Sequence, residues 1–272
     1  MPAIHLARLK KQAAELADYF HDPPALRNAL FEILDHYADR TRRHGQAGEP
    51  PPLRTAHNVP APVMRQIVKE LSTLVGNYPE SGLILCDTLW KQTYLEENLI
   101  AAYLLGYIRQ ENPEPVLERV HQWLESKPES RLVQAILEHS LAGIRRDTPE
   151  LYVRTLEEWV TDTDVYKKQI GLKAMLTLID QPGFDDLAAI FRWINPLIRT
   201  SPTEIRSEIV DVLRVLARRS PIETAYNMRR IFGSSQENNH AAWFMRQTLK
   251  YFPTHIQLQL RLALRQERSQ FH

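Results

Sequence analysis

Apolar and polar positions follow a helical rhythm along this chain, and the rhythm repeats at a period of roughly 35 residues. After each short polar break an amphipathic run begins, and it ends at or near a proline, at positions 113, 149, 182, 221 and 253. Such self-similarity predicts stacked helical hairpins rather than a closed globule. Four of the five tryptophans lie just before a break: Trp90, Trp123, Trp159 and Trp193, spaced 33, 36 and 34 residues apart.

The first segment of the chain predicts two helices. Residues 4–20 carry apolar side chains three and four positions apart, as one face of a helix requires. The Asp22-Pro23-Pro24 break ends this helix, and Asp22 is a plausible cap for a second helix over 25–43. Residues 45–52 are rich in glycine and proline and predict an exposed loop.

The rest of the chain predicts a helix over 63–75, five hairpins and a basic terminal helix over 255–267. The side chains of Thr93, Asp164, Thr203 and Asn238 or Asn239 can cap the second helices of their hairpins. The hairpins pair 81–90 with 94–108, 115–124 with 130–144, 149–160 with 164–179, 185–198 with 203–217, and 222–232 with 239–252.

We therefore expect an all-α fold, a right-handed α-solenoid of HEAT-like helical hairpins forming an α-α superhelix. A single array would run through residues 1–272, with N-terminal helices and a proline-rich loop over 1–62, repeats over 63–253 and a basic C-terminal helix over 254–272. The recurrent tryptophan is interpreted as core, since an indole in the last turn of a first helix covers the end of the inter-helix core. Base stacking is the alternative.

Composition adds little about chemistry. The single cysteine, Cys86, lies in an apolar run and is expected to be a buried thiol, in a protein of a reducing cytoplasm. We expect no signal peptide, no membrane span and no cofactor or metal. With 34 basic and 33 acidic residues the net charge is +1, which gives no support to a polyanionic partner. From Arg219 onward, however, the sequence contains 8 basic and 3 acidic residues, so this part of the chain is locally basic.

Three segments resemble the DNA alkylation repair family, the AlkD-like HEAT-repeat glycosylases. Segment 57–69 reads HNVPAPVMRQIVK and is similar to the family's entry segment, which has an arginine one turn after a threonine-proline pair. Segment 89–102, LWKQTYLEENLIAA, resembles a Leu-Trp, break, Glu-x-x-x-x-Ala-Ala block. Residues 149–151 (PEL), Trp159 and 164–168 (DVYKK) resemble a third block. The match spans about residues 55–220, and the chain looks like a divergent member.

The resemblance implies a chemistry. An N-alkylated purine is cationic, so its glycosidic bond is already weakened. A carboxylate near the sugar and aromatic faces beside it suffice to stabilise an oxocarbenium-like sugar and the departing base, with no metal and no base flipping.

The residues expected for that chemistry are not matched. The family's catalytic aspartate falls on Ile136 and its partnering tryptophan on Arg131, so no catalytic residue is assigned. A second family tryptophan falls near Asp211, and a phosphate-binding arginine falls near Gln169. The substitute carboxylates to consider are Glu129, Glu138 and Asp211.

If second helices line the concave face, their basic residues form a ladder that can follow the phosphate backbone of duplex DNA. Pairing with neighbouring acids, as for Arg131 with Glu129 or Arg206 with Glu204, is the alternative. The ladder consists of Arg131, Lys167, Lys168, Lys173, Arg206 and Arg246. Three functions remain: a DNA-binding solenoid, an active alkylpurine glycosylase with rearranged carboxylates, and a scaffold for a protein partner.

Overall fold

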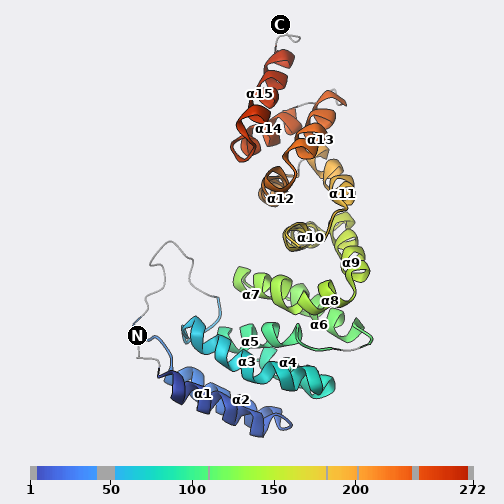
Figure 1. Ribbon diagram of the computed structural model, residues 1–272. Helices are drawn as coiled ribbons and strands as arrows, with labels where there is room; N and C mark the ends of the chain where they lie inside the picture. Colours follow the sequence, from blue (N-terminus) through green and yellow to red (C-terminus); the bar gives the residue numbers. More distant parts are fainter. Residues whose placement is uncertain are drawn as a thin grey trace. The chain divides into compact units, whose positions relative to one another are not determined.

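The computed structural model describes residues 5–41, 53–109, 111–181, 183–200, 202–234 and 239–268 (Figure 1). The regular elements in these ranges are all helical, which confirms the all-α prediction. Contacts divide the chain into two compact units, unit 1 over Met1–Tyr152 and unit 2 over Val153–His272. The predicted loop over 45–52 lies outside the described residues, as do Pro182 and Asn238.

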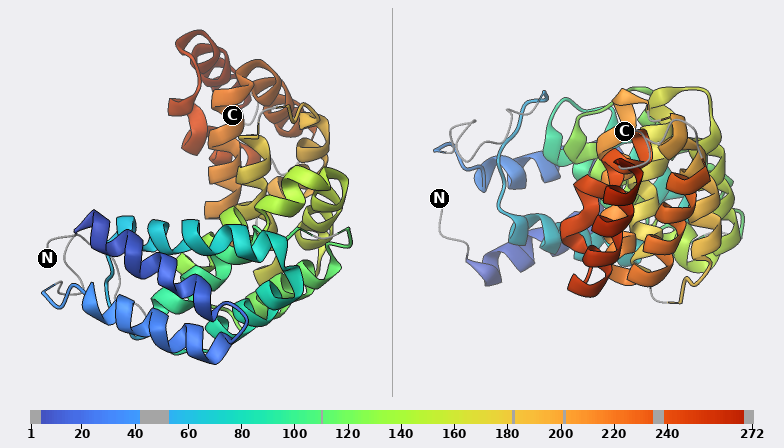
Figure 2. Two further views of the ribbon diagram at one scale, coloured as in Figure 1. Left: turned by 60° about the horizontal axis from the view of Figure 1, so that its bottom comes forward. Right: turned by 90° about the horizontal axis from the view of Figure 1, so that it is seen from above.

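Unit 1 is built from two layers of helices (Figure 2). One layer stacks α1, α3, α5 and α7 in sequence order, and in the other layer α2 packs on α4. The elements of unit 1 are α1 (Leu6–Glu15), the 3₁₀ turn η1 (Leu16–Tyr19), α2 (Pro23–His36), α3 (Ala61–Asn77), α4 (Pro79–Trp90), α5 (Leu95–Leu105), α6 (Glu114–Glu125), α7 (Ser130–Ala135), the π-helical turn η2 (Ile136–Ser140) and α8 (Ala142–Asp147).

Unit 2 repeats this arrangement. Here α10 packs on α12 and α12 on α14, while α11 packs on α13 and α13 on α15. We call α3, α5 and α7 the second-helix layer of unit 1, and α10, α12 and α14 the second-helix layer of unit 2. The elements are α9 (Pro149–Thr161), which enters from unit 1, α10 (Val165–Ile179), α11 (Leu187–Thr200), η3 (Thr203–Ile205), α12 (Arg206–Arg219), α13 (Pro221–Ser234), α14 (Asn239–Thr248), η4 (Leu249–Tyr251) and α15 (Thr254–Arg268).

The helices of the five predicted hairpins lie against their predicted partners, with Gly171 of α10 close to Val160 of α9 in the third, and several helix boundaries differ from the prediction. The Asp22 carboxylate accepts from the amide of Ala25, and the Asp164 carboxylate accepts from that of Tyr166, so both predicted caps are correct. The predictions for Thr93 and Thr203 are wrong. The residue before α5 is Tyr94, which provides no side-chain cap, and Thr203 itself begins a 3₁₀ turn.

Two helices end or change earlier than predicted. The helix predicted over 25–43 ends at His36, because the next residues turn to meet the segment that follows the loop. The helix predicted over 130–144 is interrupted by η2. A Cβ atom on Gly106 would lie 1.9 Å from the carbonyl oxygen of His139, so the end of α5 lies against the π-helical turn.

The recurrent tryptophans belong mainly to the core. Trp123, Trp159 and Trp193 are buried, and Trp90 is half-buried. Cys86 is fully buried and burial raises the pKa of its thiol, which confirms the core interpretation.

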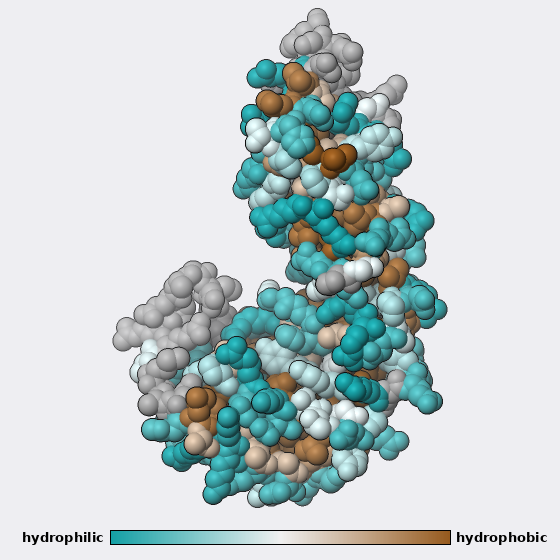
Figure 3. All heavy atoms as spheres, in the orientation of Figure 1, coloured by the Kyte–Doolittle hydropathy of each residue, from teal (hydrophilic) through white to brown (hydrophobic). Residues whose placement is uncertain are grey.

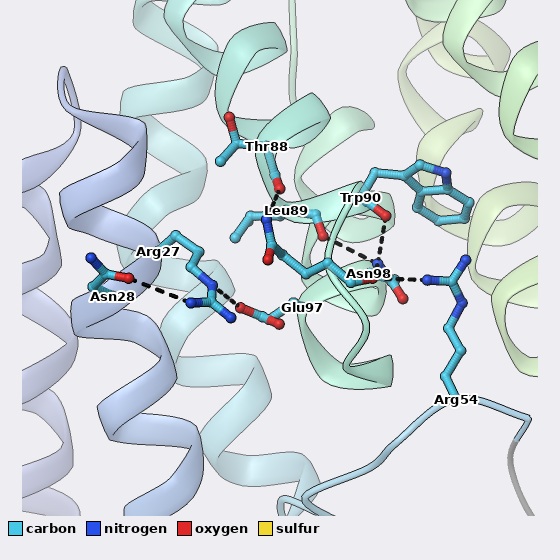
Figure 4. Close-up of polar contacts among 9 residues, drawn as sticks. Arg27, Asn28, Arg54, Thr88, Leu89, Trp90, Glu97 and Asn98 are labelled. Carbon is cyan, nitrogen blue, oxygen red and sulfur yellow. Dashed lines mark hydrogen bonds and ion pairs between the residues drawn. The ribbon is translucent and has the colours of Figure 1, made fainter.

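Residues 53–60 form a segment that crosses the start of α5, and we call it the strap. Thr55 pairs with Tyr94 in an isolated bridge, and the amide of Leu95 donates to the carbonyl of Thr55 at 2.9 Å. The side chain of Arg54, which Figure 4 labels, donates to the carbonyl of Gln92 at 2.9 Å. The strap gives the start of α5 the hydrogen-bond partners that a side-chain cap would otherwise supply.

Three consecutive polar residues at the start of α5 are buried and anchor their surroundings. Glu96 accepts the amides of His57 and Val59 from the strap. Glu97 receives the Arg27 guanidinium of α2 at 2.8 Å, and Asn98 donates to the carbonyls of Leu89, Trp90 and Gln92 at the end of α4 (Figure 4). These contacts fix α5 against both of its neighbours.

Candidate functional site

A groove of about 680 Å³ runs between α3 and α5 in unit 1. One end is formed by the strap, where Asn58 has a φ of 55°. Its apolar floor comes from Met64 and Val68 of α3 and from Leu99 of α5, all of which are largely buried. A groove of this size fits a small molecule or a part of a larger one.

Aromatic rings line the other side of the groove. Tyr103 lies on α5, Tyr107 lies in the turn that follows α5, and His139 lies on η2. The rings of Tyr103 and His139 meet edge to face, with centroids 4.6 Å apart. Burial raises the pKa of Tyr103 and lowers that of His139, so both rings are uncharged at neutral pH.

Three cations stand at the rim of this groove. Arg65 and Lys69 lie one turn apart on α3, and Arg131 lies at the start of α7. Within the described part of the chain, no carboxylate lies within ion-pair distance of any of them. The positive charge of Arg131 acts on the hydroxyl of Tyr103 and opposes the rise in its pKa. An anion in the groove would therefore meet three available cations.

The two carboxylates that line the groove are already engaged. Both oxygens of Glu96 accept strap amides, from His57 at 3.0 Å and Val59 at 3.3 Å. Asp39 accepts from the amide and the hydroxyl of Thr41. These hydrogen bonds hold both carboxylates in place and occupy their oxygens, so we expect neither acid to bind a ligand in the groove.

Of the six cations in the predicted ladder, the groove contains only Arg131. Arg65 and Lys69, which stand beside it, were not assigned from the sequence as binding residues. The spacing of the sequence could have indicated them. In segment 57–69, Arg65 and Lys69 each follow a buried residue, Met64 or Val68, one helical turn apart, which places both cations at the edge of the buried face.

The other five ladder residues lie on the second-helix layer of unit 2. Lys167 pairs with Asp162 at 3.0 Å, and Lys173 pairs with Glu208 at 3.8 Å. Arg206 lies over the ring of Trp243 at 5.6 Å. The remaining two are Lys168, which is half-buried on α10, and Arg246, which is exposed on α14.

A second group of cations in unit 2 surrounds one tyrosine. The side chains of Arg214, Arg218 and Lys250 each lie 5.1 to 6.0 Å from the centre of the Tyr251 ring. Arg214 also pairs with Asp211 at 3.1 Å. The ring quadrupole attracts all three charges and holds them close together despite their mutual repulsion.

The three substitute carboxylates have different surroundings. Glu129 accepts the amides of Leu53 and Arg54 and so anchors the strap. Asp211 is paired with Arg214 in unit 2. Glu138 is exposed and accepts from Gln134. Its charge adds to the rise in the pKa of Tyr103 that burial causes, and it opposes the fall in the pKa of His139. Glu138 is therefore the carboxylate that acts on the aromatic wall of the groove.

Among the described residues, no group of histidine, cysteine or acidic side chains is arranged to hold a metal ion. No described helix is both long enough and apolar enough to cross a membrane.

The family model for DNA alkylation repair enzymes matches residues 32–252, which is most of the chain. The chain belongs to the DNA alkylation repair family. This match covers the groove of unit 1 and the second-helix layers of both units. Searches of curated proteins and of solved structures found no significant match.

In this member of the DNA alkylation repair family, the two positions at which the sequence analysis expects the family's reactive residues differ in solvent exposure. Ile136 is wholly buried, whereas Arg131 is exposed at the rim of the groove. Gln169 donates to the carbonyl of Glu204 at 2.7 Å and so joins α10 to the turn before α12.

Proposed function

We propose that this protein binds duplex DNA through its second-helix layers, by contact with the phosphate backbone and without reading base sequence. The observation that carries the proposal is the group formed by Arg65, Lys69 and Arg131, three cations at one rim of a groove in a member of a DNA repair family. When such cations neutralise DNA phosphates, the counterions condensed on the DNA are released. This release drives binding that does not depend on base sequence.

Unit 2 contributes to the same binding. Its ladder residues lie on helices that pack in sequence order, so the phosphate backbone of DNA can contact them one after another. These residues are Lys167, Lys168, Lys173, Arg206 and Arg246. Lys167 and Lys173 must loosen their contacts with Asp162 and Glu208 before they bind phosphate. Ion pairs at the protein surface are weak, so this cost is small.

We further propose that the family's catalytic positions are replaced in this chain. An isoleucine carries no charge, and burial keeps Ile136 away from any ligand. Arg131 bears a positive charge, which would repel a cationic alkylated base and attract a phosphate.

A binding titration tests the proposal. Labelled duplexes of two unrelated sequences are titrated with the full chain at two salt concentrations, and binding is followed by fluorescence anisotropy. We expect similar affinity for both sequences and weaker binding at the higher salt. If no duplex is bound at either concentration, the proposal is wrong.

An active glycosylase is the second candidate, and Glu138 is the observation that favours it. This exposed carboxylate acts on Tyr103 and His139 beside the groove. Release of 7-methylguanine from alkylated DNA would reveal the activity. Loss of release in Glu138→Gln but not in Asp211→Asn would assign the chemistry to Glu138, and retention in both would exclude these two carboxylates.

A protein scaffold is the third candidate. On α13 and α15, which pack together, Ile222, Tyr226, Leu258 and Leu262 are all more than half exposed. On the face drawn in Figure 3, hydrophobic atoms form small separate patches in a hydrophilic surface. The affinity of a partner protein for these apolar side chains should not fall as the salt concentration rises, and this separates the scaffold from DNA binding.

A further inference from the structure

The groove of unit 1 has features that a surface for the phosphate backbone alone does not need. To bind the phosphate backbone of DNA, a protein surface requires only positively charged side chains. This groove is recessed by about 680 Å³ and combines an apolar floor at Met64 and Leu99 with an aromatic side at Tyr103 and Tyr107. Such a lining matches a flat, partly apolar ring rather than a phosphate.

The aromatic side is held in place by an unusual piece of backbone. The π-helical turn η2 displaces His139 relative to a regular helix, and its ring meets Tyr103 edge to face. Gly106 permits this placement, because any side chain there would collide with the carbonyl of His139. Ser140, the next residue, is buried and donates to the carbonyl of Ala102 at 2.8 Å. The turn is thus held against the end of α5 at His139 and at Ser140.

The charges at the groove select the occupant further. Arg65, Lys69 and Arg131 have no carboxylate partner among the described residues, while Glu96 and Asp39 are engaged by the strap and by Thr41. The available charge is positive and belongs to exposed side chains, whereas the apolar residues Met64 and Leu99 of the lining are buried. An occupant that complements this pattern carries a flat ring with anionic groups attached to it.

We propose that the groove binds one unpaired nucleotide of a DNA chain, with its base against Tyr103, Tyr107 and Leu99 and its flanking phosphates on Arg65, Lys69 and Arg131. This inference rests on the proposed DNA binding and adds a preference to it. The base enters an aromatic groove because it has left the stack, and stacking on tyrosine repays part of that loss.

The test compares two duplexes of the same sequence, one fully paired and one with a single unpaired adenosine at its centre. Anisotropy titrations use the full chain. We expect the wild-type protein to bind the duplex with the unpaired base at least about fivefold more tightly, as stacking of one base implies. Tyr103→Ala and Tyr107→Ala should reduce this ratio toward one with little effect on the paired duplex. Tyr226→Ala is the matched control, because Tyr226 is an exposed tyrosine of unit 2 that lies outside the groove.

A second readout reports on the base itself. The unpaired adenosine is replaced by 2-aminopurine, whose fluorescence should be quenched when the wild-type protein binds and should recover in Tyr103→Ala. If Tyr103→Ala proves misfolded by circular dichroism, Tyr107→Ala decides the question, because Tyr107 is 49% exposed and its loss leaves the core intact.

The outcomes separate the two proposals. Equal binding of both duplexes by the wild-type protein would refute the nucleotide site and leave duplex binding in place. A preference that survives both tyrosine substitutions would also refute it. Absence of binding to either duplex would remove the proposed function and this inference with it. A glutamate-rich peptide that displaces the unpaired duplex as effectively as unlabelled DNA would show that the groove responds to charge alone and would overturn the proposal.

Discussion

Trp90 and Trp123 stack face to face, with ring centroids 4.1 Å apart and planes inclined by 7°. They occupy the last turns of α4 and α6, one repeat apart in the sequence. The guanidinium of Arg54 lies 5.9 Å from the Trp90 ring on the strap side. In unit 2, the Trp193 indole donates to Glu157 on the preceding first helix at 3.1 Å. The recurrent tryptophan therefore connects consecutive first helices as well as filling the core.

Trp123→Ala should lower the free energy of unfolding by about 3–5 kcal/mol, because the indole is 2% exposed and its removal leaves a cavity. Trp90→Ala should cost less, since Trp90 is half-buried. Urea denaturation followed by circular dichroism measures both. A smaller loss for Trp123→Ala than for Trp90→Ala would contradict the assignment of Trp123 to the core.

Gly106→Ala should strongly destabilise unit 1, since its Cβ atom would lie 1.9 Å from a backbone carbonyl that η2 holds in place. Gly76→Ala is the matched control. There the added Cβ meets the Tyr107 carbonyl at 3.4 Å, an ordinary contact, so the helix propensity of alanine should leave stability unchanged or raise it by up to about 1 kcal/mol. Thermal unfolding of the two variants checks this, and equal melting temperatures would argue against the close contact between α5 and η2.

Stability should fall when the pH drops below 6.5, because burial lowers the pKa of His57 from that value. Glu96 and Asp35 oppose the shift without reversing it. The unfolded chain then takes up a proton at a pH where the folded chain does not, so acid favours unfolding from 6.5 down to the folded pKa of His57. Burial acts on His139 in the same direction.

Urea midpoints at about pH 7.5 and about pH 5.5 measure this loss in wild-type protein and in His57→Gln. The variant should lose less stability between the two conditions. His139→Gln reports the separate contribution of η2. An equal change with pH in the wild type and both variants would assign the effect to other groups.

Lys167→Glu combined with Lys168→Glu should weaken DNA binding for every sequence if the ladder of unit 2 contacts phosphates. Each lost phosphate contact should reduce the slope of log K against log salt by about 0.9. Single substitutions to glutamine sharpen the prediction. Lys168→Gln should have the larger effect, because Lys167 already pairs with Asp162 at 3.0 Å whereas Lys168 has no carboxylate at ion-pair distance among the described residues.

Unchanged affinity and slope in the double variant would reject this face of unit 2. Arg65→Gln combined with Lys69→Gln makes the parallel test in unit 1. Arg229→Gln is the control, because it removes one positive charge from α13, which lies outside the second-helix layer.

The periodicity of the sequence predicted the helices and their pairing. A helix buries one face, and this requires apolar residues at regular spacings of three and four positions, which can be seen within a short stretch of sequence. The caps at Asp22 and Asp164 were predictable for a similar reason, since the capping residue and its partner amide lie within three positions. The predicted caps at Thr93 and Thr203 failed. Near Thr93 the strap, which comes from a distant part of the sequence, supplies the partner at the start of α5.

The same distinction between local and long-range contacts decides how much of the candidate site could be predicted. The sequence by itself determined the all-α repeat, the core tryptophans, the buried thiol of Cys86 and the kinship with DNA alkylation repair proteins, because each is written in residues close together or in a repeated order. Only the tertiary structure brought Arg65 and Lys69 of α3 beside Arg131 of α7 and the two tyrosines at the end of α5 and in the turn after it. It did so through a π-helical turn and a strap whose hydrogen bonds join residues about 40 to 75 positions apart, and no local pattern encodes such contacts.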